Sequence, residues 1–153
     1  AGGGVIRIVA VREARVDGTL TAAGGAGEHA SGGGAGGAIF LACGAFSGGA
    51  AYRLAATGGA GMNWQSGTSQ GGGGGGGRIA VAVGLSDNDL ENLIVGAPVE
   101  RLTASPTHPD FEGSISVTNG VGYFMPPHEY GATSGTWTFL RIAPPPGSVL
   151  LVR

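Results

Sequence analysis

Seven consecutive glycines at residues 71–77 lead directly into the apolar stretch RIAVAV at residues 78–83. The larger side chains of this stretch alternate with smaller ones, which is the pattern of a β-strand. The same junction recurs, because glycine segments also precede the apolar runs at residues 5–9, 38–42 and 136–140. A glycine segment that repeatedly leads into a short strand predicts a stack of similar units.

A second repeated motif closes the units. LTAAGGAG at residues 20–27 matches LAATGGAG at residues 54–61 and, more loosely, ISVTNGVG at residues 115–122. Each unit therefore comprises a glycine segment, a first strand, a connector, a second strand and a glycine-rich turn. The third unit is about twice as long as the others, and its excess falls between Leu85 and Asp110. Ser86, which acidic residues follow, predicts a short helix or a surface turn there.

Alignment of the units on their glycines places similar side chains at equivalent positions. Successive side chains of a strand point to opposite faces, so three columns are predicted to point inward. The fold expected from these columns is all-β, a parallel β-solenoid (β-helix) with glycine-rich, polyproline-II-like segments between its strands. It forms a single domain over residues 1–153 with an inserted loop at about 85–110. The inward columns are Ile6, Ile39, Ile79 and Trp137; Ile8, Leu41, Val81 and Phe139; and Leu20, Leu54 and Ile115.

The glycine segments need a physical reason, because glycine destabilises an ordinary strand by about 0.5–1 kcal/mol relative to alanine. Backbones without side chains can approach one another closely. An extended polyproline-II-like path also leaves its N–H and C=O groups free for lateral hydrogen bonds. We therefore expect a third wall in which glycine segments pack side by side. The alternative is a flexible glycine linker.

Composition excludes several classes of protein. The 34 glycines follow no strict three-residue period and the glycine-rich half lacks proline, which excludes a collagen triple helix. A hydrophobic content of 42% with only 12% charged residues argues against a disordered chain. Lysine is absent and the eight arginines are scattered, so no nucleic-acid binding is expected. No apolar run approaches the length of a membrane helix, so no membrane insertion is expected.

The residues that carry chemistry form no recognisable site, so the chain is expected to be non-enzymatic, without cofactor or metal. The position that holds aspartate in calcium-binding glycine-rich repeats holds His29 and Asn63 here. The other histidines, His108 and His128, lie in separate loops. The single cysteine, Cys43, is expected to be a small buried residue. A lyase mechanism that uses acids of the insertion with Arg101 as base remains an alternative.

Aromatic residues in the loops suggest a second alternative. Trp64, Tyr123, Phe124 and Tyr130 follow the glycine-rich turns, on what would be one edge of the stack. Flat sugar rings stack on exposed aromatic rings, so these residues are candidate glycan contacts in a carbohydrate-binding module. The competing interpretation is that they cover the open edge of the core or form a subunit contact. Ice binding is disfavoured, because the outward positions form no ladder of threonines.

Four segments, GGGAGGAIFLAC, GGGGGGGRIAVAVG, VDGTLTAAGGAG and GTWTFLRI, carry a resemblance. They resemble the glycine-rich β-helix repeats of large secreted and surface-attached bacterial proteins. The resemblance implies an adhesive, matrix or fibre-forming role outside the cell. It implies no catalytic residues.

The two ends of the stack suggest how such a protein would assemble. The first strand and the last strands are expected to have no partner within the chain, and unpaired strand edges favour association. We therefore expect an extracellular structural protein that stacks end to end into a homopolymer, or a segment of a surface adhesin. The predicted assembly interface consists of Val5, Ile6, Arg7, Ile8, Trp137, Phe139, Val149 and Leu151.

Overall fold

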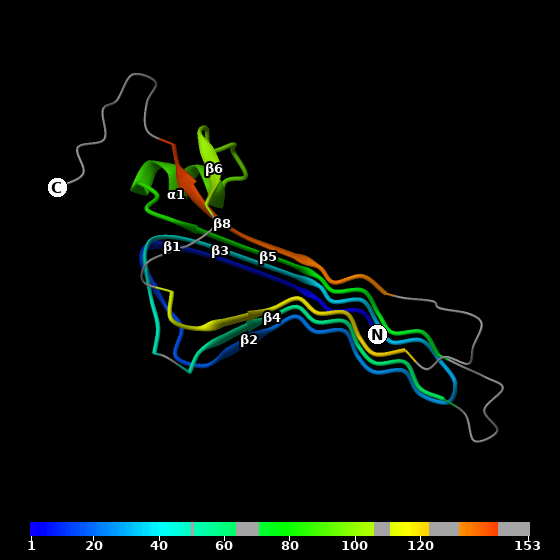
Figure 1. The fold of residues 1–153 in the computed structure, drawn as a ribbon. Coiled ribbons are helices and arrows are strands. Elements are labelled where there is room, and N and C mark those ends of the chain that lie inside the picture. Colours follow the sequence, from blue (N-terminus) through cyan, green and yellow to red (C-terminus); the bar gives the residue numbers. More distant parts are fainter. Residues whose placement is uncertain (50, 64–70, 106–110, 123–131, 144–153) are drawn as a thin grey trace.

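A computed structural model describes residues 1–49, 51–63, 71–105, 111–122 and 132–143. Figure 1 shows two sheets that face each other and a long arm that projects from them. In the described residues, the arm carries neither helix nor strand. No helix of the described residues is long and apolar enough to cross a membrane.

The larger sheet contains four parallel strands and one antiparallel strand. The parallel strands are β1 (Val5–Arg15), β3 (Ala38–Ser47), β5 (Arg78–Val83) and β8 (Thr136–Ile142), in that spatial order. Strand β6 (Leu102–Ser105) pairs antiparallel with β8 at the edge. The four parallel strands are the first strands of the predicted units.

The smaller sheet contains the second strands of three units. These are β2 (Thr19–Thr21), β4 (Arg53–Ala55) and β7 (Ser114–Ser116), and all three are parallel. Leu20 pairs with Leu54, which pairs with Ile115, as the sequence columns predicted.

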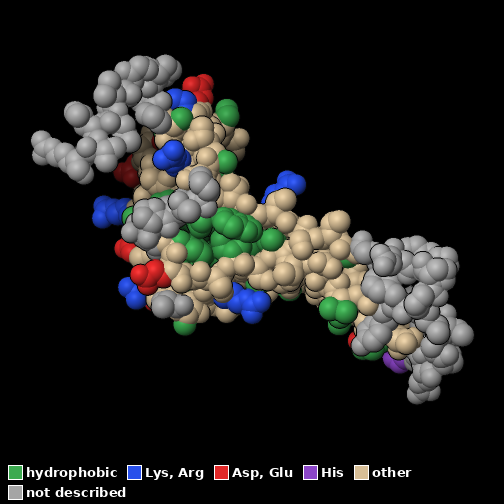
Figure 2. Space-filling model, viewed as in Figure 1, with side chains coloured by type: hydrophobic (Ala, Val, Ile, Leu, Met, Phe, Trp, Pro, Cys, Tyr) green, Lys and Arg blue, Asp and Glu red, His purple; other side chains and the backbone are tan. Residues whose placement is uncertain are grey.

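The main hydrophobic core lies between the two sheets, and Figure 2 shows hydrophobic side chains gathered there. The predicted columns of the larger sheet are confirmed by its register, in which Ile39 pairs with both Ile6 and Ile79. Ile39 and Ile79 are almost fully buried, as are Leu41 and Val81 in the adjacent column. Alternation along the strands therefore fills the core as expected. Trp137 is the exception, because it was predicted to point inward but is 46% exposed.

The prediction of an all-β solenoid is wrong. The fold is mixed α/β, with a five-stranded mixed sheet, a three-stranded parallel sheet and a helix. The helix, α1 (Asp87–Ile94), and the antiparallel strand β6 both come from the inserted segment. The repeat positions the parallel strands, but the insertion supplies elements that a repeat alone does not contain.

The helix begins where the sequence predicted one. The Ser86 hydroxyl accepts a hydrogen bond from the Asp89 N–H, and the Asp89 carboxylate accepts one from the Ser86 N–H, which makes a capping box. Gly96, with φ of +77°, ends the helix in the left-handed conformation that glycine adopts without strain.

The insertion covers part of the outer face of the larger sheet and makes a second core. Leu90 of α1 is fully buried there against Ala42 of β3 and Ala82 of β5. Phe40 was expected to point to solvent, but it packs against this cluster and is only partly exposed. The larger sheet is therefore buried on both faces beneath the insertion.

The glycine arm is built from two layers of segments, which we call leading and return segments (Figure 1). Leading segments precede the strands of the larger sheet, and return segments follow the strands of the smaller sheet. The leading segments are residues 1–4, 31–37, 71–77 and 132–135, and the return segments are residues 22–29, 56–63 and 117–122.

Backbone hydrogen bonds join the segments of the arm laterally. One series crosses between the layers, because the N–H of Gly120 donates to Gly74, Gly74 to Gly59, Gly59 to Gly34, and Gly34 to Gly25, over 2.8–2.9 Å. The lateral packing expected from the sequence is confirmed, and the linker interpretation is wrong. These bonds satisfy backbone groups that packing removes from water, as buried backbone requires.

The requirement for glycine in the arm has a period of three. A Cβ added at residues 71, 73, 74, 76 or 77 would lie 2.0 Å from a backbone oxygen, whereas one at Gly72 would meet nothing within 4 Å. At Gly75 the nearest atom would lie 3.6 Å away. An extended helix with three residues per turn produces this alternation. The period is hidden in the sequence, because outward positions hold glycine as often as alanine.

Candidate association surface

The described residues contain no cluster of three or more His, Cys, Asp or Glu side chains suited to binding a metal and no buried charged side chain. Cys43 is buried as predicted, and burial raises the pKa of its thiol to about 11. A thiol with that pKa stays protonated and is a poor nucleophile at neutral pH.

Only some residues of the lyase, metal and glycan alternatives lie in the described part of the chain. Arg101 is exposed, and its guanidinium donates a hydrogen bond to the Ala143 carbonyl over 3.4 Å. Together with Asp89 and Glu100 it lines a polar surface hollow of about 280 Å³ beside α1. His29 lies in the described part of the chain. The other candidates lie outside the described residues: His108, His128, Trp64, Tyr123, Phe124 and Tyr130.

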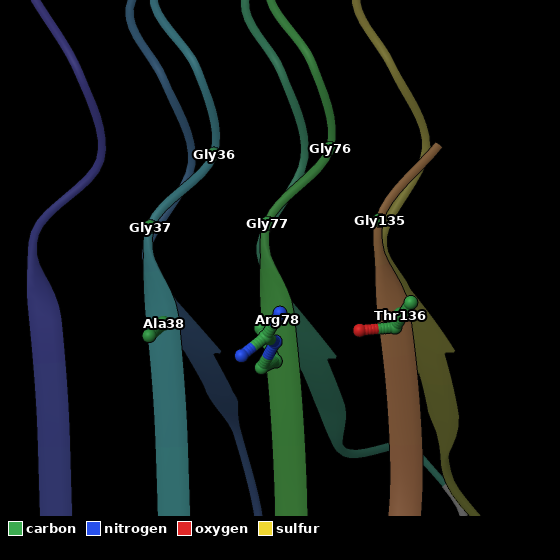
Figure 3. Close-up of a pocket in the computed structure, with 8 residues that line it drawn as sticks. All are labelled: Gly36, Gly37, Ala38, Gly76, Gly77, Arg78, Gly135 and Thr136. Carbon is green, nitrogen blue, oxygen red and sulfur yellow. The ribbon is translucent and has the colours of Figure 1, made fainter. Parts of the chain in front are cut away.

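A shallow hollow of about 410 Å³ lies where the leading segments meet the larger sheet. Figure 3 shows that Ala38, Arg78 and Thr136 line it from the adjacent strands β3, β5 and β8. The rest of its lining is glycine. A Cβ at any of these glycines would clash with backbone, so the hollow is a depression lined by backbone, with one guanidinium beside it.

The edge of the larger sheet at β8 differs from the prediction. Phe139–Ile142 pairs with β6, so this half of β8 does not present free backbone groups. Head-to-tail stacking would place β1 of another copy in the position that β6 occupies. The insertion therefore occupies half of the strand edge at which the sequence predicted end-to-end contact.

The opposite edge of the molecule is formed by the first unit, and we call it the first-unit edge. It comprises residues 1–4, β1, β2 and residues 22–29. Strand β1 pairs only with β3 in the described structure. Because the Ala38 N–H donates to Gly4, alternation in a parallel ladder directs the backbone groups of Ile6 toward β3 and those of Arg7 toward the free edge.

An apolar hollow of about 280 Å³ opens on this edge, with Ile8, Val16 and Leu20 in its lining. Ile8 and Leu20 are only partly buried, whereas Leu41 and Leu54, their counterparts in the second unit, are fully buried. The difference arises because the second unit has a neighbour on each side. The first-unit edge thus exposes part of the column that stacking covers elsewhere.

An ion pair lies on the rim of this hollow. The Arg15 Nε lies 2.6 Å from an Asp17 carboxylate oxygen, and the other oxygen accepts a hydrogen bond from the Gly49 N–H. The hydrogen bond from Arg15, together with that from Gly49, lowers the pKa of Asp17. Both side chains are exposed, so the pair orients the β1–β2 connection but contributes little stability.

Unused carbonyl groups continue the edge along the arm. Within each layer, the N–H groups of one unit donate to the carbonyls of the next; for example, Gly24 donates to Thr57 and Gly27 to Ala60. The equivalent carbonyls of the first unit belong to Ala23 and Ala26. These residues are exposed, and no N–H of the described chain donates to their carbonyls.

The same holds in the leading layer. The Gly3 N–H donates to Ala35 and the Gly36 N–H donates to Gly75. The equivalent carbonyl of the first unit is that of Gly2, which receives no donor from the described residues. The first-unit edge therefore presents three aligned acceptors.

The last-unit edge of the arm is closed by side chains. Asn119 replaces the glycine found at Gly24 and Gly58, and its amide donates to the Gly120 carbonyl over 3.3 Å. The Ser134 hydroxyl donates to the Asn119 side chain over 3.2 Å. In the second unit, the equivalent carbonyl is that of Gly59, which accepts a hydrogen bond from the Gly74 N–H of the following unit. Asn119 therefore takes the place of a further segment.

Four of the predicted interface residues lie on strand β1. Val5 is 77% exposed and Arg7 is exposed, with its guanidinium donating to the Leu93 carbonyl. Ile6 and Ile8 pack partly against the core. These four residues lie together on the first-unit edge.

Of the residues predicted at the other end, only Trp137 and Phe139 lie in the described part of the chain. Trp137 is 46% exposed, with its ring 5.7 Å from that of Phe139. Phe139 is buried, with its ring 5.1 Å from that of Phe111. Val149 and Leu151 lie outside the described residues.

Sequence reasoning missed the backbone acceptors and the side chains that close the last unit. Asn119 was visible as a departure from the GGxG motif, and that substitution was the available signal. The free carbonyls of Gly2, Ala23 and Ala26 could not be predicted from residue type, because every residue has a carbonyl. Comparison with protein-family models, curated proteins and solved structures found no match.

Proposed function

We propose that the protein is a structural, non-catalytic element of an extracellular assembly. Its first-unit edge binds a strand, with its glycine segments, from a neighbouring polypeptide of the same construction. The observation that carries the proposal is the free edge of β1, continuous with the unused acceptors of the arm. An extracellular location is favoured by the resemblance of the glycine–strand motifs to secreted repeat proteins.

Continuity supports a partner of the same construction. Inside the chain, each unit already forms this contact with the next, through parallel pairing of strands and lateral bonding of glycine segments. The first-unit edge offers the same strand direction and the same spacing of acceptors. A strand added there would also cover the partly exposed Ile8 and Leu20. Strand addition to an open edge obtains its affinity from such main-chain bonds.

Binding of a peptide tests the proposal. The peptide comprises residues 31–63, the second unit of this chain, and carries a fluorescent label whose anisotropy reports binding. Arg7→Pro removes the one edge N–H at that position while leaving the β1–β3 bonds in place, since proline is tolerated on an edge strand. We expect it to weaken binding by about tenfold, which corresponds to ~1.4 kcal/mol, the size of one hydrogen bond.

Arg7→Ala is the matched control. It removes the same guanidinium and its contact with Leu93 but keeps the N–H, so it should bind the peptide like the wild type. Circular dichroism establishes that each variant is folded. Failure of the wild-type protein to bind the peptide, or equal binding by Arg7→Pro, would refute the proposal.

A further inference from the structure

Two glycines on the first-unit edge have no steric reason to be glycine. A Cβ at Gly4 would meet nothing within 4 Å, and one at Gly25 would meet only Ala1 at 3.4 Å. Both residues are exposed. Neither has the positive φ that would favour glycine, because Gly84 and Gly96 are the described glycines with that conformation.

Their counterparts in the other units are tightly packed. Gly37, the counterpart of Gly4, would place a Cβ 1.9 Å from the Gly4 carbonyl oxygen. Gly59, the counterpart of Gly25, would place one 2.0 Å from the Gly25 carbonyl oxygen. In both cases the obstacle is the preceding unit. At these positions glycine is required wherever a preceding unit is present.

At the last-unit edge, by contrast, residues with side chains replace the glycines. A Cβ at Gly36 would meet the Ala56 carbonyl oxygen of its own unit at 2.3 Å and the Gly77 nitrogen of the following unit at 2.6 Å. The equivalent position in the last unit is Ser134, whose side chain lies where a following unit would have to pack. Ser134 and Asn119 thus close one edge of the arm, while Gly4 and Gly25 keep the other edge clear.

From these observations we infer that the first-unit edge is a selective binding site for a glycine-rich segment, and that it extends beyond β1 along the arm. This inference rests on the proposed function and specifies its partner. The partner runs parallel to β1 and donates three N–H groups, to the carbonyls of Gly2, Ala23 and Ala26. It carries glycine wherever its Cβ would face the first unit.

The partner's own requirements follow from the contacts inside the chain. In the second-unit peptide the donors are the N–H groups of Gly36, Gly58 and Gly61, which bond the third unit in the intact protein. A Cβ at Gly58 would lie 2.0 Å from the Gly74 oxygen of that following unit. Ala35 is exposed and points away from neighbouring segments. Gly58 is therefore critical for docking and Ala35 is not.

Anisotropy measurements with paired variants test the inference. In the protein, Gly4→Val should leave the fold unchanged and weaken binding of the 31–63 peptide by about a hundredfold, because the added side chain occupies the docking space. Gly72→Val is the matched control, because Gly72 also has open space around its Cβ but lies away from this edge. It should bind the peptide like the wild type.

In the peptide, Gly58→Ala should abolish binding while Ala35→Val should retain it. Equal binding of the two peptides, or undiminished binding by Gly4→Val protein, would overturn the inference. A peptide limited to residues 38–47 separates the two proposals. If it binds as tightly as the 31–63 peptide, strand addition stands and the selectivity for glycine fails; if neither peptide binds, both proposals fail.

Discussion

At the scale of single residues, the direction in which a Cβ would point determines whether a position in the arm requires glycine. Gly74 and Gly72 are both glycines of one seven-residue run, yet their surroundings differ completely. A Cβ at Gly74 would lie 2.0 Å from the Gly34 oxygen, and the Gly74 N–H also donates to the Gly59 carbonyl. Gly72 has open space in the same direction.

Substitution of these two glycines by alanine should therefore have opposite effects. Gly74→Ala should destabilise the protein by about 1–3 kcal/mol, because the segment must move away from its neighbours. Gly72→Ala should be neutral or stabilising by up to about 1 kcal/mol, because alanine restricts the unfolded chain. Urea unfolding measures both free energies of unfolding. Equal changes would mean that the arm tolerates side chains in every direction.

At the scale of elements, the insertion changes the environment of the strands it covers. The outward positions Ala42 and Ala82 would be exposed in a bare sheet, but the structure buries both beneath α1. Their small side chains let the helix approach the sheet. Leu90 is a large side chain of the second core, and it is fully buried.

Leu90→Ala should destabilise the protein by about 2–5 kcal/mol through the cavity it leaves. Ile94, on the same helix, is 55% exposed, so Ile94→Ala should change stability by less than about 0.5 kcal/mol. Thermal unfolding of both variants provides the comparison. A Leu90→Ala protein as stable as Ile94→Ala would mean that α1 does not pack on the sheet in solution.

At the scale of the whole molecule, the two edges of the stack are unequal. Strand β6 covers half of β8, and Asn119 and Ser134 close the last unit of the arm. The first-unit edge keeps its strand and its carbonyls free in the described structure. Under the proposed function, association would therefore use the first-unit edge rather than both ends of the stack.

Removal of the insertion together with Asn119→Gly and Ser134→Gly should open the last-unit edge to stacking. Replacement of residues 86–105 by a short Gly-Ser linker uncovers β8, and the two glycine substitutions clear the last unit of the arm. The strand β1 of a second copy can then pair with β8. A contact of this heterologous kind propagates into a filament. The weight-average molar mass from light scattering should rise with concentration for this variant and stay constant for the wild type.

Adding Arg7→Pro to the deletion variant distinguishes stacking through strand pairing from nonspecific aggregation. Stacking needs the β1 edge, so the combined variant should lose the association. Aggregation through the uncovered apolar face would persist in the combined variant and would contradict the stacking mechanism.

Much of the framework was readable from the chain, because local chemistry dictates it. Alternation predicted the strands and the columns, and the register of Ile6, Ile39 and Ile79 follows them. The absence of side chains in the glycine segments predicted lateral hydrogen bonding. Ser86 and its acidic neighbours predicted the start of α1, since helix capping is a local interaction.

The remainder was decided by tertiary structure, because it depends on what lies beside each residue. The fold class changed because β6 pairs with a strand more than thirty residues away, and no local pattern encodes that pairing. Gly4, Gly37 and Gly72 are chemically identical, so sequence alone cannot distinguish a glycine packed against backbone from one facing open space. The chain itself determined its strands, its columns and its glycine segments. Only the assembled structure determined which edge is closed and which is free, because packing against neighbouring segments gives each glycine its role.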